Sequence, residues 1–366
     1  MKAKKIIISG GGTGGHVFPA IAIANALKEI DSSIEILFVG ANGKMEMEKV
    51  PAAGYQIKGL PVQGLVRKLT FKNFVVIFNL LKSLFISRKI IKTFKPDAVI
   101  GVGGFASAPV VYIASLIGIP TLLQEQNSYA GITNKLLAKR AEKICVAYDN
   151  MHKFFPKQKI VKSGNPVRQS LYKNDIDKEL ALNHFGLSKN KKTILILGGS
   201  GGAKSINEAV INRLEKIKDS DIQVIWQTGK YYYNVSNEAA SKIQAKNCLV
   251  KDFITRMDYA YRSADLVISR AGAATISELC LLKIPAILVP SPNVAEDHQS
   301  KNAMALVENN AAILIHNKDA FENMIDEALV LIQNTEKLEE LSKNISKLGI
   351  ENSDKIIAEE VFKIIK

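Results

Sequence analysis

The sequence has few cysteines, and its apolar runs are too short to form a secretory signal or a membrane span. The three cysteines, Cys145, Cys248 and Cys280, lie apart in apolar segments without metal-ligand or Cys-x-x-Cys spacing. We therefore expect buried free thiols in a reducing compartment. The apolar stretch near the N-terminus runs at once into glycines, which argues against a secretory signal and predicts a cytoplasmic location.

Acidic residues are absent from one long stretch of the chain. Residues 49–96 contain ten lysines and arginines and no aspartate or glutamate. The formal net charge of +14 lies entirely in residues 1–165, because residues 166–366 hold equal numbers of acids and bases. The two halves therefore face different partners, and the partner of the first half is expected to be anionic.

An apolar segment within that stretch has more than one interpretation. Residues 70–86 are mostly apolar but are interrupted by Lys72 and Lys82, and they fall short of the roughly 20 residues that span a bilayer. The segment can lie in an anionic membrane interface, or it can be a sheet-covering helix with a solvated basic face. Its phenylalanines stand among Ile, Leu and Val, which argues against nucleic acid as the partner.

One pattern occurs twice in the chain. An apolar run leads into a glycine cluster at IIISGGGTGG (6–15) and again at ILILGGSGG (194–202). A shift of 188 residues superposes the two without a gap and carries the apolar run 34–38 onto 222–226. A strand, a glycine-rich turn, a helix and a second strand that recur in this way predict two nucleotide-binding-type α/β domains in tandem.

Strands and helices are predicted to alternate along the whole chain. Apolar runs without alternation are typical of strands buried on both faces, and hence of doubly wound parallel sheets. We place one Rossmann-like domain at residues 1–165 and a second at 166–349, with the turn GNPVR (164–168) at the crossing. The predicted strands are 5–9, 34–39, 97–101, 120–123, 143–146, 160–162, 193–197, 222–226, 248–250, 265–268, 286–289 and 312–315.

The first glycine-rich loop, residues 10–15, matches the G-x-G-x-x-G pattern of dinucleotide sites. The acidic residue that such a site needs at the end of the next strand is missing from VGANG (39–43), so a dinucleotide-dependent oxidoreductase is the weaker alternative. We interpret the loop as a nest of backbone amides for a phosphate or a developing negative charge. His16, which follows it, is either a general base or a structural helix cap.

Two further turns follow strands of the first domain. GVGGFASAP (101–109) is glycine-rich, and QEQNSYAG (124–131) places Glu125, Gln126 and Asn127 after a strand. The carboxyl ends of parallel strands meet at one rim, where ligands bind in open α/β sheets. We therefore expect three loops to converge on one site.

Three segments of the second domain predict a second ligand site. GGSGGAKSIN (198–207) repeats the anion-binding turn, with Ser200 as a hydroxyl donor. Glu278 stands on a helix, where it either holds ribose hydroxyls or is a first-turn acid favoured by the helix dipole. His298 and Gln299 suit sugar hydroxyls. Because no His, Cys or Asp cluster has metal-ligand spacing and no acidic pair flanks these turns, the predicted chemistry uses no metal.

Seven motifs between residues 10 and 303 together resemble one family. They are GGTGGHVFPA, GVGGFASAP, QEQNSYAGITNK, GNPVR, GGSGGA, RAGAATISEL and HQxxNA. The family is that of the bacterial cell-wall glycosyltransferases, which move N-acetylglucosamine from UDP-N-acetylglucosamine to undecaprenyl-pyrophosphoryl-N-acetylmuramoyl-pentapeptide, the last cytoplasmic step of peptidoglycan precursor synthesis. The chain departs from the family at Gly201, where glutamine is usual, and at Phe105, where tyrosine is usual.

The resemblance implies the glycosyltransferase B fold, with an acceptor domain, a donor domain and a cleft between them. A C-terminal helix near 350–366 would return to the first domain. It also implies an inverting displacement without metal or cofactor, in which His16 or Glu125 deprotonates the muramoyl 4-hydroxyl. The implied substrate-binding residues are Thr13, Gly14, Gly15 and Asn127 near the acceptor, Arg168 and Ser200 at the diphosphate, Ile254 at the uracil, Glu278 at the ribose with Ala273, Ala274, Thr275, Ile276 and Ser277 before it, and Gln299 at the sugar.

The resemblance also bears on the basic segment and on the alternatives. It places residues 67–95 on the anionic cytoplasmic face of the bacterial inner membrane, where the lipid-linked acceptor lies. Another nucleotide-sugar-dependent glycosyltransferase of the same fold is the alternative. The motifs GGTGGH and QEQN argue against it, because motifs of the donor side alone are shared widely among such enzymes.

Overall fold

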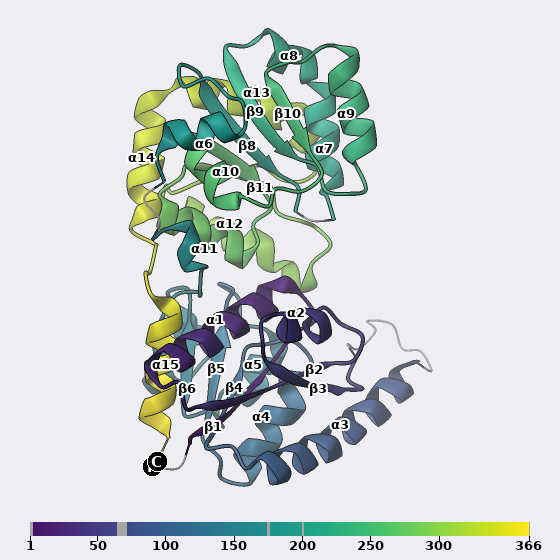
Figure 1. The fold of residues 1–366 in the computed structure, drawn as a ribbon, viewed down its shortest axis with the longest axis vertical. Helices are drawn as coiled ribbons and strands as arrows, with labels where there is room; N and C mark the ends of the chain where they lie inside the picture. The colour runs from purple at the N-terminus through teal and green to yellow at the C-terminus, as the bar shows by residue number, and fades with distance from the viewer. Residues whose placement is uncertain (1–2, 64–71, 174–175, 200, 366) are drawn as a thin grey trace. The chain divides into compact units, whose positions relative to one another are not determined.

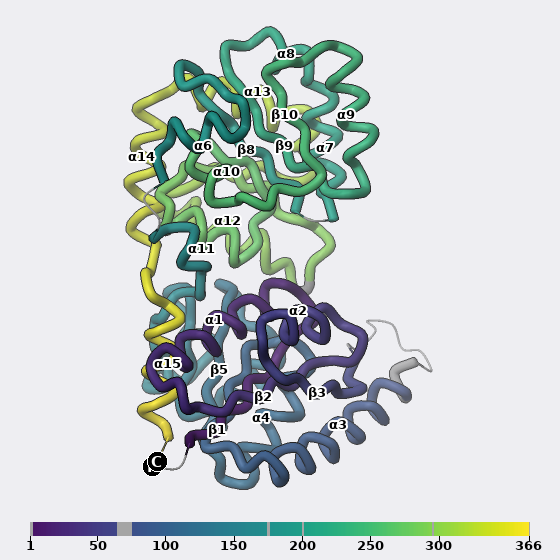
Figure 2. Tube along the Cα trace, in the orientation of Figure 1, coloured from purple at the N-terminus to yellow at the C-terminus, as the bar shows by residue number. Residues whose placement is uncertain are grey.

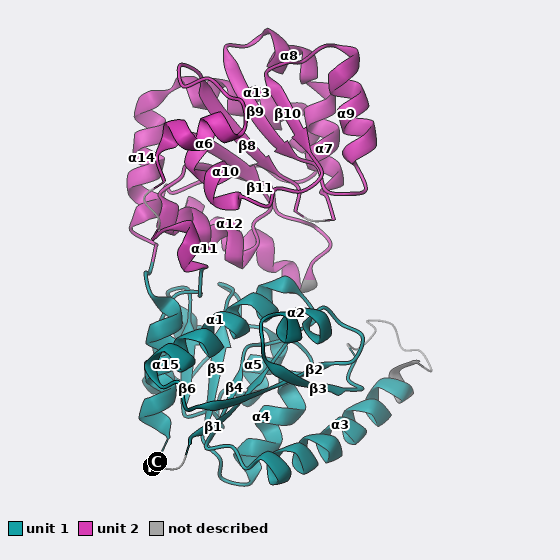
Figure 3. Cartoon of the chain, in the orientation of Figure 1, with its two compact units in different colours: residues 1–167, 350–366 teal, residues 168–349 magenta. Residues whose placement is uncertain are grey.

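The computed structural model describes residues 3–63, 72–173, 176–199 and 201–365, and Figure 1 shows its ribbon. The chain divides into two compact units (Figure 3). Unit 1 consists of Met1–Val167 and Ile350–Lys366, and unit 2 consists of Arg168–Gly349. Each unit is built on one parallel sheet, which confirms the predicted pair of α/β domains.

Unit 1 contains a seven-stranded sheet with the order β3-β2-β1-β4-β5-β6-β7. Its strands are β1 (Lys5–Ser9), β2 (Glu35–Ala41), β3 (Gln56–Leu60), β4 (Ala98–Gly101), β5 (Thr121–Glu125), β6 (Lys143–Val146) and β7 (Ile160–Lys162). Its α-helices are α1 (Gly14–Ile30), α2 (Glu46–Ala52), α3 (Lys72–Phe94), α4 (Ser107–Leu116), α5 (Ile132–Leu137) and α15 (Ser353–Ile364). All six strands predicted for this domain are present, and β3 is the additional one.

The continuous apolar run of β1 follows from burial of both faces of the sheet. Ile6 and Ile8 pack in one cluster with residues of α1 and α15, such as Leu27 and Ile357. Ile7 packs in a second cluster on the other face, with residues of α3 and α4. Successive strand residues point to opposite faces, so a strand covered on both sides is apolar at every position. The C-terminal helix α15 lies beside α1 (Figure 2).

Unit 2 contains a six-stranded sheet with the order β10-β9-β8-β11-β12-β13. Its strands are β8 (Lys192–Leu197), β9 (Ile222–Gln227), β10 (Cys248–Lys251), β11 (Leu266–Ser269), β12 (Ala286–Leu288) and β13 (Ile313–Leu314). Its α-helices are α6 (Lys178–His184), α7 (Lys204–Asn212), α8 (Leu214–Asp219), α9 (Tyr233–Lys242), α10 (Met257–Ser263), α11 (Ala273–Leu282), α12 (His298–Val307), α13 (Ala320–Gln333) and α14 (Thr335–Ser346).

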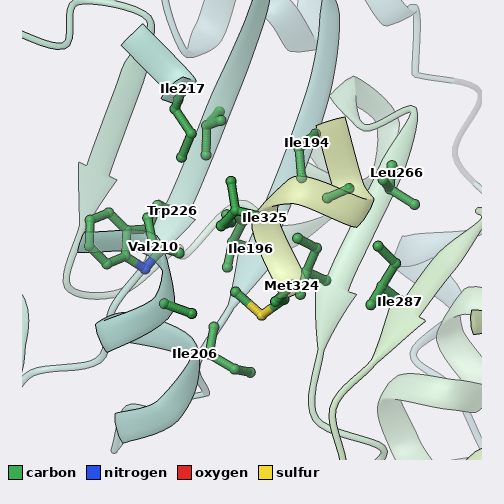
Figure 4. Close-up of a cluster of buried hydrophobic side chains, with 14 of the residues drawn as sticks. Ile194, Ile196, Ile206, Val210, Ile217, Trp226, Leu266, Ile287, Met324 and Ile325 are labelled. Atoms are coloured by element: carbon green, nitrogen blue, oxygen red, sulfur yellow. The ribbon is translucent and has the colours of Figure 1, made fainter. Parts of the chain in front are cut away.

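The core of unit 2 surrounds the central strand β8. Figure 4 shows Ile194 and Ile196 of this strand with Trp226, Met324 and Ile325. Trp226 is fully buried, and its indole N–H donates a hydrogen bond of 3.0 Å to Asn207 Oδ1. The buried indole therefore keeps a partner for its single polar group.

The two sheets share strand register as well as sequence pattern. Ile6 of β1 pairs with Ile36 of β2, and the residues 188 positions later, Ile194 and Val224, pair in the same way. On the other side of each central strand, Ile6 pairs with Ala98 and Ile194 pairs with Leu266. The repeat in the sequence is thus a repeat of two paired strands, and in both sheets a third parallel strand lies on the other side of the central strand.

The three cysteines are buried and free, as predicted. Burial raises the pKa of the thiols of Cys145, Cys248 and Cys280 to about 12, so each remains protonated at neutral pH. Among the described residues, no helix has the length and apolar character that crossing a bilayer requires.

Candidate active site

The loop of residues 10–15 joins β1 to α1 at the carboxyl end of β1. Gly11 and Gly12 have φ of +150° and +89°, conformations that L side chains rarely adopt. Glu46, the first residue of α2, reaches the loop from the protein interior. Its Oε2 accepts the backbone N–H of Gly12 at 2.9 Å, and its Oε1 accepts that of Ala41 at 2.9 Å. One amide of the predicted anion nest is therefore bound to a carboxylate of the protein itself.

His16 lies in the first turn of α1, between two glycine-rich loops. Thr13 Oγ1 is 3.3 Å from His16 Nδ1, and the carbonyl of Thr13 accepts the backbone N–H of His16 at 3.1 Å. The opposite edge of the imidazole faces Gly103, in the loop after β4. A Cβ atom added to Gly103 would lie 2.8 Å from Cδ2 and 2.9 Å from Nε2 of His16. The loops after β1 and β4, two of the three that were expected to converge, thus meet at this imidazole.

Glu125 ends β5 and is enclosed by hydrogen-bond donors. Its Oε2 accepts the backbone N–H of Gly131 and the side-chain amide of Asn134, both at 2.9 Å. Its Oε1 accepts the backbone N–H and the side-chain amide of Asn127, at 3.1 and 3.3 Å. Burial raises the pKa of Glu125, and these hydrogen bonds oppose the shift. The carboxylate holds the turn 126–131, and Asn127 with it.

The second glycine-rich loop, residues 198–203, joins β8 to α7. The N–H of Gly198 donates to Gln227 O at 2.9 Å, which ties the start of the loop to the end of β9. Gly202 has a φ of +85°, and a Cβ atom there would lie 2.5 Å from Thr228 O and from the ring of Tyr232. The close approach of residues 228–232 therefore requires glycine at 202. Ser200, the predicted hydroxyl donor, lies outside the described residues.

Glu278 and Arg168, both predicted from the sequence, lie together in unit 2. Arg168 Nη2 is 3.9 Å from Glu278 Oε1, and the hydroxyl of Tyr261 donates to Glu278 Oε2 at 2.8 Å. Burial raises the pKa of Glu278, while the Tyr261 hydrogen bond and the positive charge of Arg168 oppose the shift. Burial and the neighbouring Glu278 also raise the pKa of Tyr261 well above its ordinary value, so the phenol stays a donor.

Two further predicted residues of unit 2, Ile254 and Gln299, each take part in a hydrogen bond between a backbone N–H and a glutamine side chain. The backbone N–H of Ile254 donates to Gln227 Oε1 at 2.9 Å, and the Ile254 side chain is buried. Gln299, in the first turn of α12, accepts the backbone N–H of Ser291 through Oε1 at 2.8 Å. The side-chain amide of Gln299 is thereby oriented by the loop that follows β12.

The predicted segment 273–277 forms the first turns of α11. The side chain of Ile276 is buried, and the hydroxyl of Ser277 donates to Ala273 O at 2.9 Å. Ala273, Ala274 and Thr275 form the first turn of the helix, which leaves the carboxyl end of β11. Within the parts of the chain that the structure describes, no group of three or more His, Cys, Asp or Glu side chains is arranged to hold a metal ion.

Three residues that support these loops were not predicted from the sequence. They are Glu46, Tyr261 and Arg270. The guanidinium of Arg270 donates through Nη1 to the carbonyls of Val289 and Pro290, at 3.0 and 3.2 Å. It also binds Asn317 Oδ1 at 2.7 Å and Ser205 Oγ at 3.1 Å, so it braces the loops after β11 and β12 against α7.

Known families match both halves of the chain. Residues 6–146 match the glycosyltransferase family 28 N-terminal domain, and residues 193–360 match the glycosyltransferase family 28 C-terminal domain. The chain belongs to glycosyltransferase family 28. This confirms the resemblance that the seven motifs indicated and the assignment to the glycosyltransferases.

Individual members of this family match over the full length. A protein of Phocaeicola vulgatus named UDP-N-acetylglucosamine--N-acetylmuramyl-(pentapeptide) pyrophosphoryl-undecaprenol N-acetylglucosamine transferase is 58% identical over 361 residues, which cover 98% of this chain and 96% of that protein. A protein of the same name from Flavobacterium psychrophilum is 50% identical over 368 residues, covering 100% and 99%. The crystal structure of Acinetobacter baumannii MurG matches with a TM-score of 0.80 at 29% identity and covers 98% of this chain and 99% of that one.

Proposed function

We propose that this family 28 transferase moves N-acetylglucosamine from UDP-N-acetylglucosamine to the 4-hydroxyl of undecaprenyl-pyrophosphoryl-N-acetylmuramoyl-pentapeptide. The observation that carries the proposal is the identity of 50–58% over nearly the whole chain with relatives that bear this activity in their names. The reaction would complete the lipid precursor of peptidoglycan at the cytoplasmic face of the bacterial inner membrane.

In the proposed reaction the muramoyl 4-oxygen attacks C1 of N-acetylglucosamine as the bond from C1 to the UDP oxygen breaks. The electron pair of that bond leaves with UDP, the configuration at C1 inverts, and the hydroxyl proton passes to His16. We assign the base to His16 because Glu125 already accepts four hydrogen bonds from its own loop and from α5. Thr13, Gly14, Gly15 and Asn127 border His16 or Glu125 and would contact the acceptor.

Unit 2 would hold the donor without metal or cofactor. Glu278 would accept the ribose hydroxyls, and Arg168, 3.9 Å from it, would neutralise the diphosphate together with the hydroxyl of Ser200. Ile254 would contact the uracil, and Gln299 the sugar. The turn of residues 273–277 would place the positive end of the α11 dipole near the anion.

The membrane contact would lie on α3. Along this helix Phe78, Leu81 and Phe85 are 66, 61 and 73% exposed, and their spacing puts them on one side. Lys82, Arg88, Lys89 and Lys92 are exposed on the same helix. Ser83 and Ser87 are fully buried, so α3 packs on the unit through another side. An exposed apolar stripe flanked by bases suits an anionic bilayer surface.

Replacing Phe78, Leu81 and Phe85 together by Ser should release the protein from vesicles that contain phosphatidylglycerol. Each of the three apolar side chains should contribute about 1 kcal/mol or more to the free energy of membrane binding. Their loss should therefore lower partitioning into vesicles about 100-fold. Co-sedimentation with vesicles measures it. A matched control replaces the exposed Leu180, Phe321 and Val330 of unit 2 by Ser and should bind as the parent does. Vesicle binding by a folded α3 variant that equals that of the parent would contradict the membrane contact.

Transfer itself tests the proposed function. Radiolabelled UDP-N-acetylglucosamine, the lipid-linked muramoyl-pentapeptide and the protein are combined in detergent with EDTA, and label in the lipid fraction is measured. We expect transfer that EDTA does not reduce. Donor binding without transfer would make the chain a nucleotide-sugar transferase with another acceptor, and a loss of transfer with EDTA would contradict the metal-free mechanism.

Gly103→Ala should lower turnover about tenfold or more, because the new Cβ would overlap the imidazole of His16, and small misplacements of catalytic groups are costly. The control is Gly118→Ala. Gly118 also has a positive φ, +76°, but nothing lies within 4 Å of an added Cβ, so it carries the backbone strain alone. Equal turnover in the two variants would show that contact with His16 does not matter.

A further inference from the structure

Glu46 is a buried carboxylate that joins the carboxyl ends of two neighbouring strands. It is 1% exposed. One oxygen accepts the N–H of Gly12, in the loop after β1, and the other accepts the N–H of Ala41, the last residue of β2. Hydrogen bonds from backbone N–H groups to an ionised carboxylate are stronger than those between neutral groups, so Glu46 ties the loop firmly to the end of β2.

Two glycines make the space for this side chain. A Cβ atom on Gly11 would lie 2.1 Å from Glu46 Oε1, and one on Gly40 would lie 2.5 Å from Glu46 Cγ. Gly40 has no positive φ, so its backbone does not require glycine. Glycine is required there because any larger side chain would overlap Glu46. The ends of β1 and β2 are therefore shaped around the glutamate.

The loop transmits the position of Gly12 to His16 over a short path. The residue after Gly12 is Thr13, whose carbonyl accepts the backbone N–H of His16 and of Val17, each at 3.1 Å. The Thr13 hydroxyl is 3.3 Å from the His16 imidazole. A shift of Gly12 would move Thr13, the N-cap of α1. It would thereby move the imidazole of His16, which lies in the first turn of that helix.

We propose that Glu46 is a positioning residue for the transfer reaction: by binding the Gly12 amide it fixes the loop 10–15 and so sets the place of His16. The inference rests on the proposed function, since the fixed loop serves to place His16, the base of that reaction. In this role Glu46, which is 1% exposed, does not contact a substrate. Its carboxylate acts through Gly12, Thr13 and the first turn of α1.

The chemistry of the two partners explains why a carboxylate is needed. Both are N–H donors, and a carboxylate offers an acceptor oxygen to each. Glutamine has nearly the same shape but only one acceptor oxygen, so its NH₂ group would face one of the two amides. Glu46→Gln therefore removes one hydrogen bond while it keeps the volume of the buried side chain.

Kinetics of the full chain in detergent test the proposal. In Glu46→Gln we expect kcat to fall about tenfold or more, with the KM for UDP-N-acetylglucosamine within about twofold of the parent, because the donor residues belong to unit 2. The matched control is Glu48→Gln, on the same helix, where the glutamate is exposed and pairs with Lys49. It should behave as the parent does. Gly40→Ala, which pushes on Glu46 from the other side, should reproduce the Glu46→Gln result.

A double variant distinguishes a loss of kcat that acts through His16 from a loss caused by general disruption of the structure. If Glu46 acts through His16, adding Glu46→Gln to His16→Ala should lower kcat by no more than about twofold further, since the group being placed is already gone. Additive losses would overturn the proposal, and so would a parental kcat in Glu46→Gln. If Glu46→Gln fails to fold, Gly40→Ala takes its place in the same double variant.

Nuclear magnetic resonance gives a measurement that does not depend on transfer. The chain has five histidines, so labelling of histidine ring nitrogens gives few signals to assign. Glu46→Gln should shift the His16 signals and leave those of the other four in place, and Glu48→Gln should shift none. Absence of transfer by the parent protein would contradict the proposed function alone. An unmoved His16 signal in Glu46→Gln would contradict the positioning role alone.

Discussion

His16→Ala is expected to lower turnover by about 10²- to 10⁴-fold, the range that general acid–base groups contribute. The imidazole stands between the loops after β1 and β4, with Thr13 on one edge and Gly103 on the other. Removing it deletes the proton acceptor and leaves both backbones in place. Initial rates with both substrates saturating give kcat, and calorimetry with UDP gives donor affinity. This affinity should not change, because the proposed donor residues lie in unit 2.

The control for this variant is His152→Ala. His152 is also a histidine of unit 1, and it is exposed on the short 3-10 helix Met151–Lys153 that follows β6. It should turn over at the parental rate. A His16→Ala enzyme as active as the parent would remove His16 from the mechanism and return the role of base to Glu125.

The sequence did not decide whether His16 or Glu125 is the general base. The surroundings of the two side chains differ, and this difference favours one of them. Glu125 is 2% exposed and accepts four hydrogen bonds, all from its own loop and α5. A carboxylate so occupied must give up a partner to accept a proton from substrate. His16 is partly exposed, and the Nε2 edge of its ring faces Gly103. The geometry supports a holding role for Glu125 and a chemical one for His16.

The fold could be predicted because its signals are local. Every strand buried on both faces, such as β1 or β8, leaves an unbroken apolar run, and the repeat at 188 residues revealed the second domain. Strand β3, at the edge of its sheet, was missed because it is only partly covered. Its residues alternate between exposed and partly buried, so Gln56–Leu60 leave no such run.

The site was predictable only where sequence neighbours carry it. Glycine clusters, His16 and Glu278 stand in motifs that can be recognised along the chain. The roles of Glu46 and Arg270 cannot be recognised in this way, although Arg270 opens the motif RAGAATISEL, because their partners are distant in sequence. Glu46 binds Gly12, and Arg270 binds Ser205, 65 residues away, and Asn317, 47 residues away. Such contacts exist only after the sheet has brought the strand ends together. The residues that support the loops could therefore be identified only from the folded structure.

Glu278→Ala is expected to weaken UDP binding about 10- to 100-fold, which corresponds to the loss of charged hydrogen bonds worth about 1.5–3 kcal/mol. Turnover at saturating donor should fall much less, because the ribose is remote from C1. Titration calorimetry with UDP measures the first quantity, and initial rates measure the second. Tyr261→Phe removes the donor that holds one oxygen of Glu278 and should weaken UDP binding in the same direction by a smaller factor.

The raised pKa of Glu278 gives this prediction a pH dependence with a definite sign. Ribose hydroxyls donate to a carboxylate, so UDP binding requires the ionised form. Because burial raises the pKa, UDP affinity should begin to fall at a higher pH than it would for an ordinary glutamate as the solution is acidified. Glu278→Gln cannot ionise, so its weaker binding should lose this dependence. A parental affinity in Glu278→Ala, or an acid limb that persists in Glu278→Gln, would move the ribose contact to another residue of unit 2.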